Sequence, residues 1–263
     1  MPKFAAVSRE RHAQKKWRRY ESYAFAAADA LAPVVGGELA RAALSMPCAF
    51  LEQSGRYTLV AVLSPIPGRN MFVGPGGRWL GSYVPCWLRG YPFRVVTEPG
   101  TDKFFLCVDE ESGLVVEGDV VGEDFFDADG NPSPALKPMF EFLSAVERSR
   151  RVTELAVAVL AEAGVIRPWQ IKLKSGQGEQ AVSGLHHIDG AALNALADDA
   201  FLKLRRASAL FLADAQILSA GQLGIFEQLA KFYNQPAPPP LATLPETLDS
   251  LFEMSGDDLV RFG

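Results

Sequence analysis

The residues that could carry acid–base or metal chemistry in this 263-residue chain are few and far apart. The longest run of carboxylates is Asp109–Glu111, and the histidines are His12 and the adjacent pair His186–His187. These acids, with Arg78 or Arg89 and one histidine of the pair, would suit an enzyme or a metal-dependent modifying protein. Adjacent strand residues face opposite sides, so the pair is not expected to bind one metal together.

No catalytic motif strengthens that interpretation. The sequence has no nucleophile elbow, phosphate-binding loop, zinc-protease motif or dinucleotide fingerprint. Asp127–Asn131 resembles the start of a calcium loop, but prolines stand where such a loop needs glycine and glutamate. Three cysteines without close spacing predict buried small residues, and Cys86 has no histidine near it to support a nucleophile. We therefore predict neither a cofactor nor a bound metal.

Aromatic and arginine side chains are most concentrated between residues 70 and 94. Arginine, tryptophan and tyrosine are the usual anchors of protein interfaces, so this stretch is the candidate binding surface. Its rings also suit a core, because an alternating strand hides only one of its faces. The residues predicted to bind a peptide or protein are Arg78, Trp79, Tyr83, Arg89, Tyr91 and Asp109.

Charge is unevenly distributed along a chain whose formal net charge is -5. Residues 1–22 form a basic arm, which either folds back on the acidic body or contacts RNA or a membrane. The overall charge disfavours nucleic acid as a partner. No signal peptide is recognised, and the apolar stretch 207–218 contains Asp214 and Gln216, which predicts a buried helix. We expect a cytoplasmic protein with a protein or peptide partner, and a homo-oligomer remains open.

Turn residues divide the chain into an early β-rich half and a later helical half. A helix is expected from an N-cap at Ser133 to a C-cap at Gly164, and another begins at Asp189. The expected strands cover 48–52, 57–63, 70–73, 78–80, 93–97, 103–108, 169–174, 180–182 and 185–188. Ser54-Gly55 and Gly74–Gly77 are the turns of two predicted hairpins, one between the first two strands and one between the next two. A long helix is predicted from 199 to 233, with breaks at Gly221 and Gly224. This order favours an α+β fold, a mostly antiparallel sheet packed against C-terminal helices.

Three segments are distinguished by composition. They are the basic arm (1–22), a main domain (23–234), and a proline-rich linker with an acidic tail (235–263).

Several groups of residues carry a resemblance to a known family. They are Pro33-Val-Val with Glu38 and Ala42, then Met71-Phe-Val, Gly77-Arg-Trp-Leu, Tyr83-Val-Pro85 and Tyr91-Pro-Phe93, then Leu106-Cys-Val-Asp109-Glu110, and Gly184-Leu before Ile188-Asp189. In this order, over residues 20 to 230, they resemble the SapC family of bacterial proteins. The resemblance implies a single SapC-like domain with a role in surface-array assembly or serum resistance, and it supplies no catalytic residues.

Two functions follow from the sequence. The first is a non-catalytic accessory protein that binds a peptide or protein during surface-layer or secreted-protein handling. The alternative is an enzyme or metal-dependent modifier that uses Asp109–Glu111 with a nearby arginine or histidine. Nucleic-acid binding by the basic arm ranks third.

Overall fold

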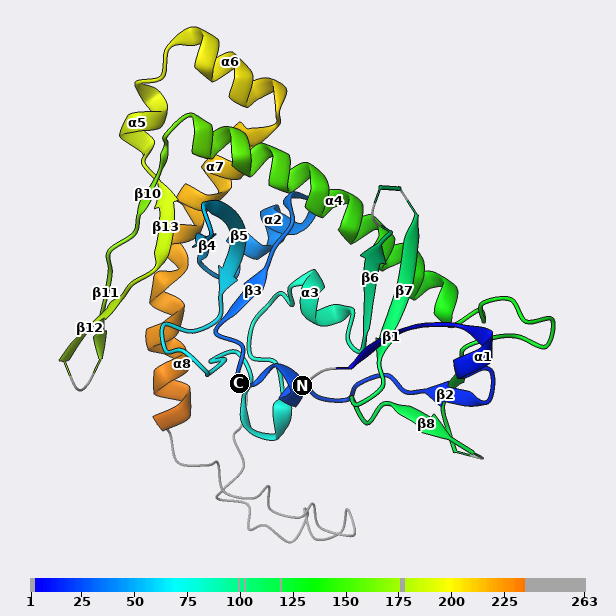
Figure 1. Ribbon diagram of the computed structural model, residues 1–263. Coiled ribbons are helices and arrows are strands. Elements are labelled where there is room, and N and C mark those ends of the chain that lie inside the picture. The colour runs from blue at the N-terminus through cyan, green and yellow to red at the C-terminus, as the bar shows by residue number, and fades with distance from the viewer. Residues whose placement is uncertain (1–2, 99, 102, 119, 176–177, 235–263) are drawn as a thin grey trace, which may run out of the picture.

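The computed structural model describes residues 3–98, 100–101, 103–118, 120–175 and 178–234. Within these ranges the strands pair antiparallel, and the longest helices lie in the C-terminal half of the chain. The expected α+β class is therefore confirmed. Two main sheets lie side by side, and one long helix crosses both (Figure 1).

The larger sheet has five strands in the order β10-β13-β4-β5-β3. Their bounds are β3 (Leu31–Pro33), β4 (Cys48–Gln53), β5 (Arg56–Val62), β10 (Ile166–Pro168) and β13 (Leu185–Ile188). Strands β4 and β5 form the predicted hairpin, because Ser54 and Gly55 adopt the positive φ angles of 52° and 78° that a two-residue turn requires.

The second sheet has the order β1-β7-β6 and joins a small sheet of order β8-β2-β9. The bounds are β1 (Phe4–Ala6), β2 (Lys15–Trp17), β6 (Phe93–Thr97), β7 (Phe104–Asp109), β8 (Val115–Glu117) and β9 (Glu123–Asp124). A separate pair consists of β11 (Ile171–Ser175) and β12 (Gly178–Val182). The described residues of the basic arm thus supply β1, the short helix α1 (Arg9–His12) and β2, so the arm folds back on the body.

The helices are α2 (Gly36–Ala43), α3 (Cys86–Arg89), α4 (Leu136–Glu162), α5 (Gly190–Asn194), α6 (Asp198–Arg206), α7 (Ala209–Ser219) and α8 (Ile225–Asn234), with 3-10 turns η1 (Ala24–Ala26), η2 (Pro75–Gly77) and η3 (Ala220–Gly224). Helix α4 corresponds to the predicted helix, and its bounds, Leu136 and Glu162, lie just inside the expected caps Ser133 and Gly164. The Ser133 hydroxyl accepts the Leu136 N–H at 3.1 Å, and Gly164 follows the helix with a φ of 67°. Leu143 of α4 packs in the smaller core and Leu160 in the larger one, so α4 connects the two.

Two local predictions were wrong. Residues 70–80 form no two-stranded ladder, since only one bridge joins Val73 to Trp79, around η2. Contacts distant in sequence hold this segment instead: the Asn70 amide donates to the Ala26 carbonyl at 3.1 Å. The long C-terminal helix also breaks earlier than expected, at Ser208, whose φ is 55°, while the two predicted glycine breaks fall within η3.

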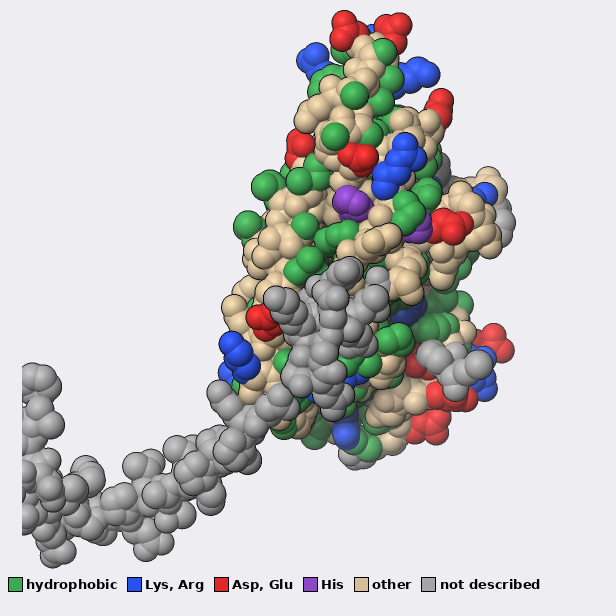
Figure 2. All heavy atoms as spheres, turned by 90° about the vertical axis from the view of Figure 1, so that its left-hand side faces the viewer, with side chains coloured by type: hydrophobic (Ala, Val, Ile, Leu, Met, Phe, Trp, Pro, Cys, Tyr) green, Lys and Arg blue, Asp and Glu red, His purple; other side chains and the backbone are tan. Residues whose placement is uncertain are grey.

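Among the described residues, the helical run Ala209–Tyr233 is long and apolar enough to cross a membrane by length and composition alone. This is weak evidence, because a core helix meets the same test. Gln216 accepts the Ile188 N–H at 2.8 Å and donates to the Cys48 carbonyl at 3.0 Å, which attaches α7 to β13 and β4. Figure 2 views this side of the molecule and shows apolar side chains scattered among polar ones.

Candidate functional site: the cavity between the two sheets

A cavity of about 570 Å³ lies between the two main sheets, against α4. It is lined by the end of β3, residues 57–59 of β5, the whole of β6, the first residues of α3 and one face of α4. We call it the inter-sheet cavity. Its size lies within the range of roughly 300–1,000 Å³ that is typical of ligand sites.

The wall formed by α4 is apolar. Leu143, Val146 and Val157 recur at helical spacing, so their side chains share the face that lines the cavity. Val95 of β6 and Leu59 of β5 also line the cavity. Apolar surface of this kind favours apolar groups of a ligand, because their contact releases water, and the attraction has no preferred direction.

Charged residues of α4 form the rim of the cavity. Arg150 donates two hydrogen bonds to Glu147, at 2.7 Å each, and also pairs with Glu154. Thr97 of β6 donates to Glu147 at 3.1 Å, which ties the helix to the strand. Although burial acts in the opposite direction, the hydrogen bonds from Arg150 lower the pKa of Glu147, so the rim carries both signs of charge at neutral pH.

Glu38 supplies a buried carboxylate to the cavity and is held there by α2. The first N–H groups of α2 are accepted by side chains of α4: Gly36 donates to Thr153 at 2.8 Å and Gly37 to Ser149 at 3.0 Å. The helix N-terminus is therefore fixed against α4, and Glu38 follows one residue later.

Three donors satisfy the Glu38 carboxylate. Its Oε2 accepts the Cys86 N–H at 2.6 Å and the Tyr83 hydroxyl at 2.8 Å, and its Oε1 accepts the Val35 N–H at 3.2 Å. A buried carboxylate without such partners would cost several kcal/mol. Glu38 thus joins α2, the Tyr83 loop and the start of α3 at one end of the cavity.

Arg89 completes this polar end. Its Nη2 donates to the Tyr83 hydroxyl at 3.1 Å and to Cys86 Sγ at 2.7 Å. The Tyr83 hydroxyl, which itself donates to Glu38, therefore links Arg89 to the Glu38 carboxylate. Burial, together with the negative charge of Glu38, raises the pKa of Cys86 to about 11. Cys86 is therefore a neutral thiol at neutral pH, which gives no support to a nucleophilic role.

A cation–π contact also borders the cavity. The guanidinium carbon of Arg94 lies 3.5 Å from the ring centroid of Trp87, a side chain that is 40% exposed. Burial lowers the pKa of Arg94, which remains charged at neutral pH. The Arg94–Trp87 pair gives this part of the cavity an aromatic surface and a positive charge.

The structure distributes the six predicted binding residues over separate places. None of the six is among the residues that line the cavity. Tyr83 and Arg89 bond to each other and to the lining residues Glu38 and Cys86, and the Trp79 indole N–H donates to the Tyr83 carbonyl at 2.9 Å. Tyr91 instead stacks on Phe25, with ring centroids 3.9 Å apart.

The other two of the six are Arg78 and Asp109. Arg78 is exposed beside η2, whereas Asp109 is buried and accepts the Lys3 N–H at 2.8 Å.

The residues of the predicted enzyme alternative are not brought together. Asp109 ends β7 of the second sheet, while His186 and His187 belong to β13 at the far side of the larger sheet (Figure 1). Among the described residues, no group of three His, Cys, Asp or Glu side chains is placed to hold a metal ion.

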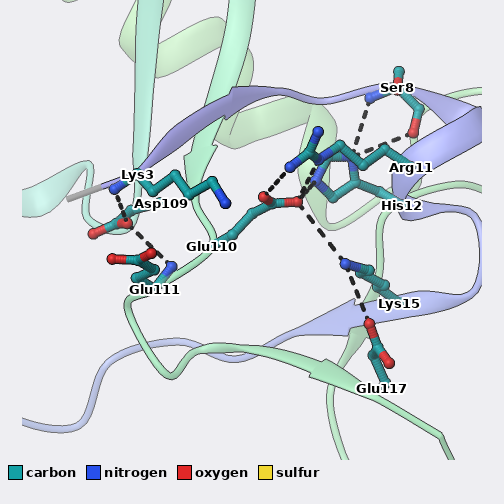
Figure 3. A network of polar contacts seen from close by, with 9 residues as sticks. All are labelled: Lys3, Ser8, Arg11, His12, Lys15, Asp109, Glu110, Glu111 and Glu117. Carbon is teal, nitrogen blue, oxygen red and sulfur yellow. Dashed lines mark hydrogen bonds and ion pairs between the residues drawn. The ribbon is translucent and has the colours of Figure 1, made fainter. Parts of the chain in front are cut away.

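Glu110 instead joins the arm in an ion-pair network (Figure 3). It accepts two hydrogen bonds from Arg11, at 2.6 and 2.5 Å. Its Oε1 lies 3.4 Å from Nε2 of the buried His12 and 3.9 Å from Nζ of Lys15. Lys15 also pairs with Glu117 at 3.2 Å. We call these five residues the arm network. Its cations are engaged within the chain.

Sequence reasoning did not select Glu38 or the α4 wall as site residues. Glu38 follows two glycines and a short apolar strand, a pattern that only indicates a helix start. The sequence predicts the helix that forms α4, but not that part of its apolar face borders an open space.

Antiparallel sheets flanked by helices, with an apolar cavity bordered by a few polar groups, define the class: an α+β protein with a cavity between two sheets. A model of one protein family, SapC, matches residues 7–225 of the chain. The chain therefore belongs to the SapC family. No curated protein and no solved structure matches it in the corresponding comparisons.

Proposed function

We propose that this SapC-family chain is a non-catalytic accessory protein that binds a peptide or protein segment in the inter-sheet cavity. The observation that carries the proposal is the cavity itself, which combines apolar residues of α4 with a few polar groups on its lining. Such a site buries apolar side chains and orients them by a few polar contacts.

The polar groups that Glu38 and Cys86 supply to the cavity suit binding better than catalysis. The Glu38 carboxylate already accepts three hydrogen bonds, and Cys86 is held as a neutral thiol. A general base or nucleophile would need a free lone pair and a pKa near the working pH. The family resemblance supports a partner class: a segment of a surface-layer or secreted protein.

The proposal is tested by selection of ligands and by filling the cavity. A phage-displayed library of random twelve-residue peptides is selected on the immobilised full-length protein, and dissociation constants of the enriched peptides are measured. Val146→Trp fills the cavity from α4, while Val152→Trp is the matched control, since Val152 lies on the same helix and is 59% exposed.

We expect Val146→Trp to weaken binding by at least about tenfold, equivalent to the loss of one well-buried contact, and Val152→Trp to leave it unchanged. Circular dichroism confirms that both variants fold. Failure to enrich any peptide, or equal binding by both variants, would refute the proposed function.

A further inference from the structure

Strand β6 lies at the edge of its sheet and lines the inter-sheet cavity along its whole length. In an antiparallel pair, alternate residues direct their N–H and C=O groups toward the partner strand, and the others direct them away. The Asp109 N–H donates to the Pro92 carbonyl at 2.9 Å, which shows which residues of β6 face β7. Arg94 and Val96 therefore bond to β7, while Val95 and Thr97 present their backbone groups on the opposite side.

Two further hydrogen bonds agree with this phase. The Phe93 N–H points away from β7 and donates to the Gly90 carbonyl at 2.7 Å. The Glu98 N–H points toward β7 and donates to the Lys103 carbonyl at 3.0 Å, at the end of the β6–β7 pair. The outward N–H and C=O groups of Val95 and Thr97 thus border the cavity, where no described strand pairs with them.

Strand β5 has a short open edge that faces the same cavity. Val62 donates to the Pro47 carbonyl on the β4 side, so Tyr57 and Leu59 direct their backbone groups to the β3 side. The Leu59 carbonyl is taken by the Val34 N–H at 3.0 Å. The chain then turns into α2, so β3 ends before it reaches Tyr57.

We infer that the cavity takes its ligand as an added β-strand, an extended peptide segment that pairs with the free edge of β6 beside the open end of β5. This inference rests on the proposed function and specifies the binding mode. An open strand edge is a template for another strand, and main-chain hydrogen bonds of this kind supply affinity in other peptide-binding folds.

The same geometry specifies the chemistry of the ligand. Helix α4 covers one face of the gap, so every second side chain of the added strand meets Leu143, Val146 and Val157. The ligand is therefore an extended segment with apolar residues at alternate positions and no proline among the pairing residues. Strand β6 has 5 residues, so the paired segment has about the same length.

The closing experiment removes one backbone donor. Proline is tolerated at an edge position whose N–H faces outward, so Val95→Pro keeps the pairing with β7 and deletes the donor that faces the cavity. Val95→Ala is the matched control, because it shortens the same side chain and keeps the N–H group. The probe is the peptide selected on the wild-type chain, and amide hydrogen exchange of Val95 and Thr97 is measured in parallel.

We expect Val95→Pro to weaken peptide binding by at least about tenfold relative to Val95→Ala, and the bound peptide to slow exchange at Val95 and Thr97 by a similar factor. If a peptide binds and Val146→Trp abolishes its binding, but Val95→Pro and the two amides are unaffected, strand addition is refuted while the proposed function stands. If no peptide is selected, both fail.

Two other occupants would also overturn the inference. Protection of the Val95 and Thr97 amides in the free chain, released on removal of residues 235–263, would assign the edge to the chain's own C-terminal segment. Binding of 1-anilinonaphthalene-8-sulfonate in the cavity, with no peptide able to displace it, would assign the cavity to small apolar molecules. Thermal unfolding of Val95→Pro establishes that a loss of binding does not arise from unfolding.

Discussion

The arm network and the inter-sheet cavity both contain partly buried charged groups, but the two regions are completed in different ways. In the arm network, acids and bases pair with one another, and Glu110 alone contacts Arg11, His12 and Lys15. At the cavity, Glu38 is satisfied by backbone and hydroxyl donors, whereas the strand edges beside it are unpaired among the described residues.

This difference shows why charge density is a poor guide to function in this chain. The acids at 109–111 and the basic arm are the most conspicuous charges of the sequence, and they bind each other. Ion pairs with Glu110 and Glu117 engage Arg11 and Lys15 of the arm within the chain. The cavity is bordered instead by backbone groups that no described strand pairs with, which composition does not reveal.

The largest expected effect breaks the polar end of the cavity. Glu38→Ala leaves the Cys86 N–H and the Tyr83 hydroxyl without their acceptor, and we expect it to lower the free energy of unfolding by roughly 3 kcal/mol. Glu38→Gln keeps one acceptor oxygen and should cost less. Urea denaturation at pH 7 measures both.

Glu141→Ala provides the control for these variants. Glu141 is exposed on α4, so its replacement should change the stability by no more than about 0.5 kcal/mol. Equal effects of Glu38→Ala and Glu141→Ala would show that the Glu38 contacts contribute nothing to the fold.

Acid should weaken the arm network next. Burial lowers the pKa of His12, so below its ordinary pKa the unfolded chain takes up a proton that the folded chain does not. The hydrogen bonds from Arg11 lower the pKa of Glu110 to about 2, so its contribution is present above its ordinary pKa and declines as the pH falls toward 2. Both effects reduce stability on acidification.

Urea denaturation between pH 7 and pH 3 tests this prediction. We plot the free energy of unfolding against pH. His12→Asn should flatten this curve near pH 6, and Glu110→Gln should flatten it below pH 5, because each variant removes one of the two groups whose protonation is linked to unfolding. A stability that rises on acidification, or slopes unchanged in both variants, would contradict the account of the arm network.

The smallest effect concerns the rim of the cavity. Arg150 is half-exposed and pairs with Glu147 and Glu154, so Arg150→Ala should cost about 0.5–1 kcal/mol, the usual value of surface ion pairs. Arg41→Ala, at an exposed position of α2, is the control. The loss should shrink in 1 M salt if the pairs are responsible, and a loss independent of salt would assign the effect to packing of the Arg150 side chain.

Local signals in the sequence predicted the parts of the fold that depend on local chemistry. The Ser54–Gly55 turn, the Ser133 cap and Gly164 after α4 act within a few residues, and the structure has all three. Residues 70–80 differ because their conformation depends on contacts with residues near 26, which no short-range pattern reveals.

The candidate site was predictable to a smaller extent. Tyr83 and Arg89 were selected because aromatic and arginine residues gather in one stretch. Glu38 was missed because its partners Tyr83 and Cys86 lie 45 and 48 residues further along the chain. The open edges of β5 and β6 depend on where β3 ends and on which strand is outermost, and both are properties of the assembled sheets.

Determination of the structure of the protein with a selected peptide bound tests the central claim most directly. The account predicts an extended peptide beside β6, hydrogen-bonded to the backbone of Val95 and Thr97, with alternate side chains against α4. A peptide bound as a helix, or seated on the face of α7 and α8, would contradict it.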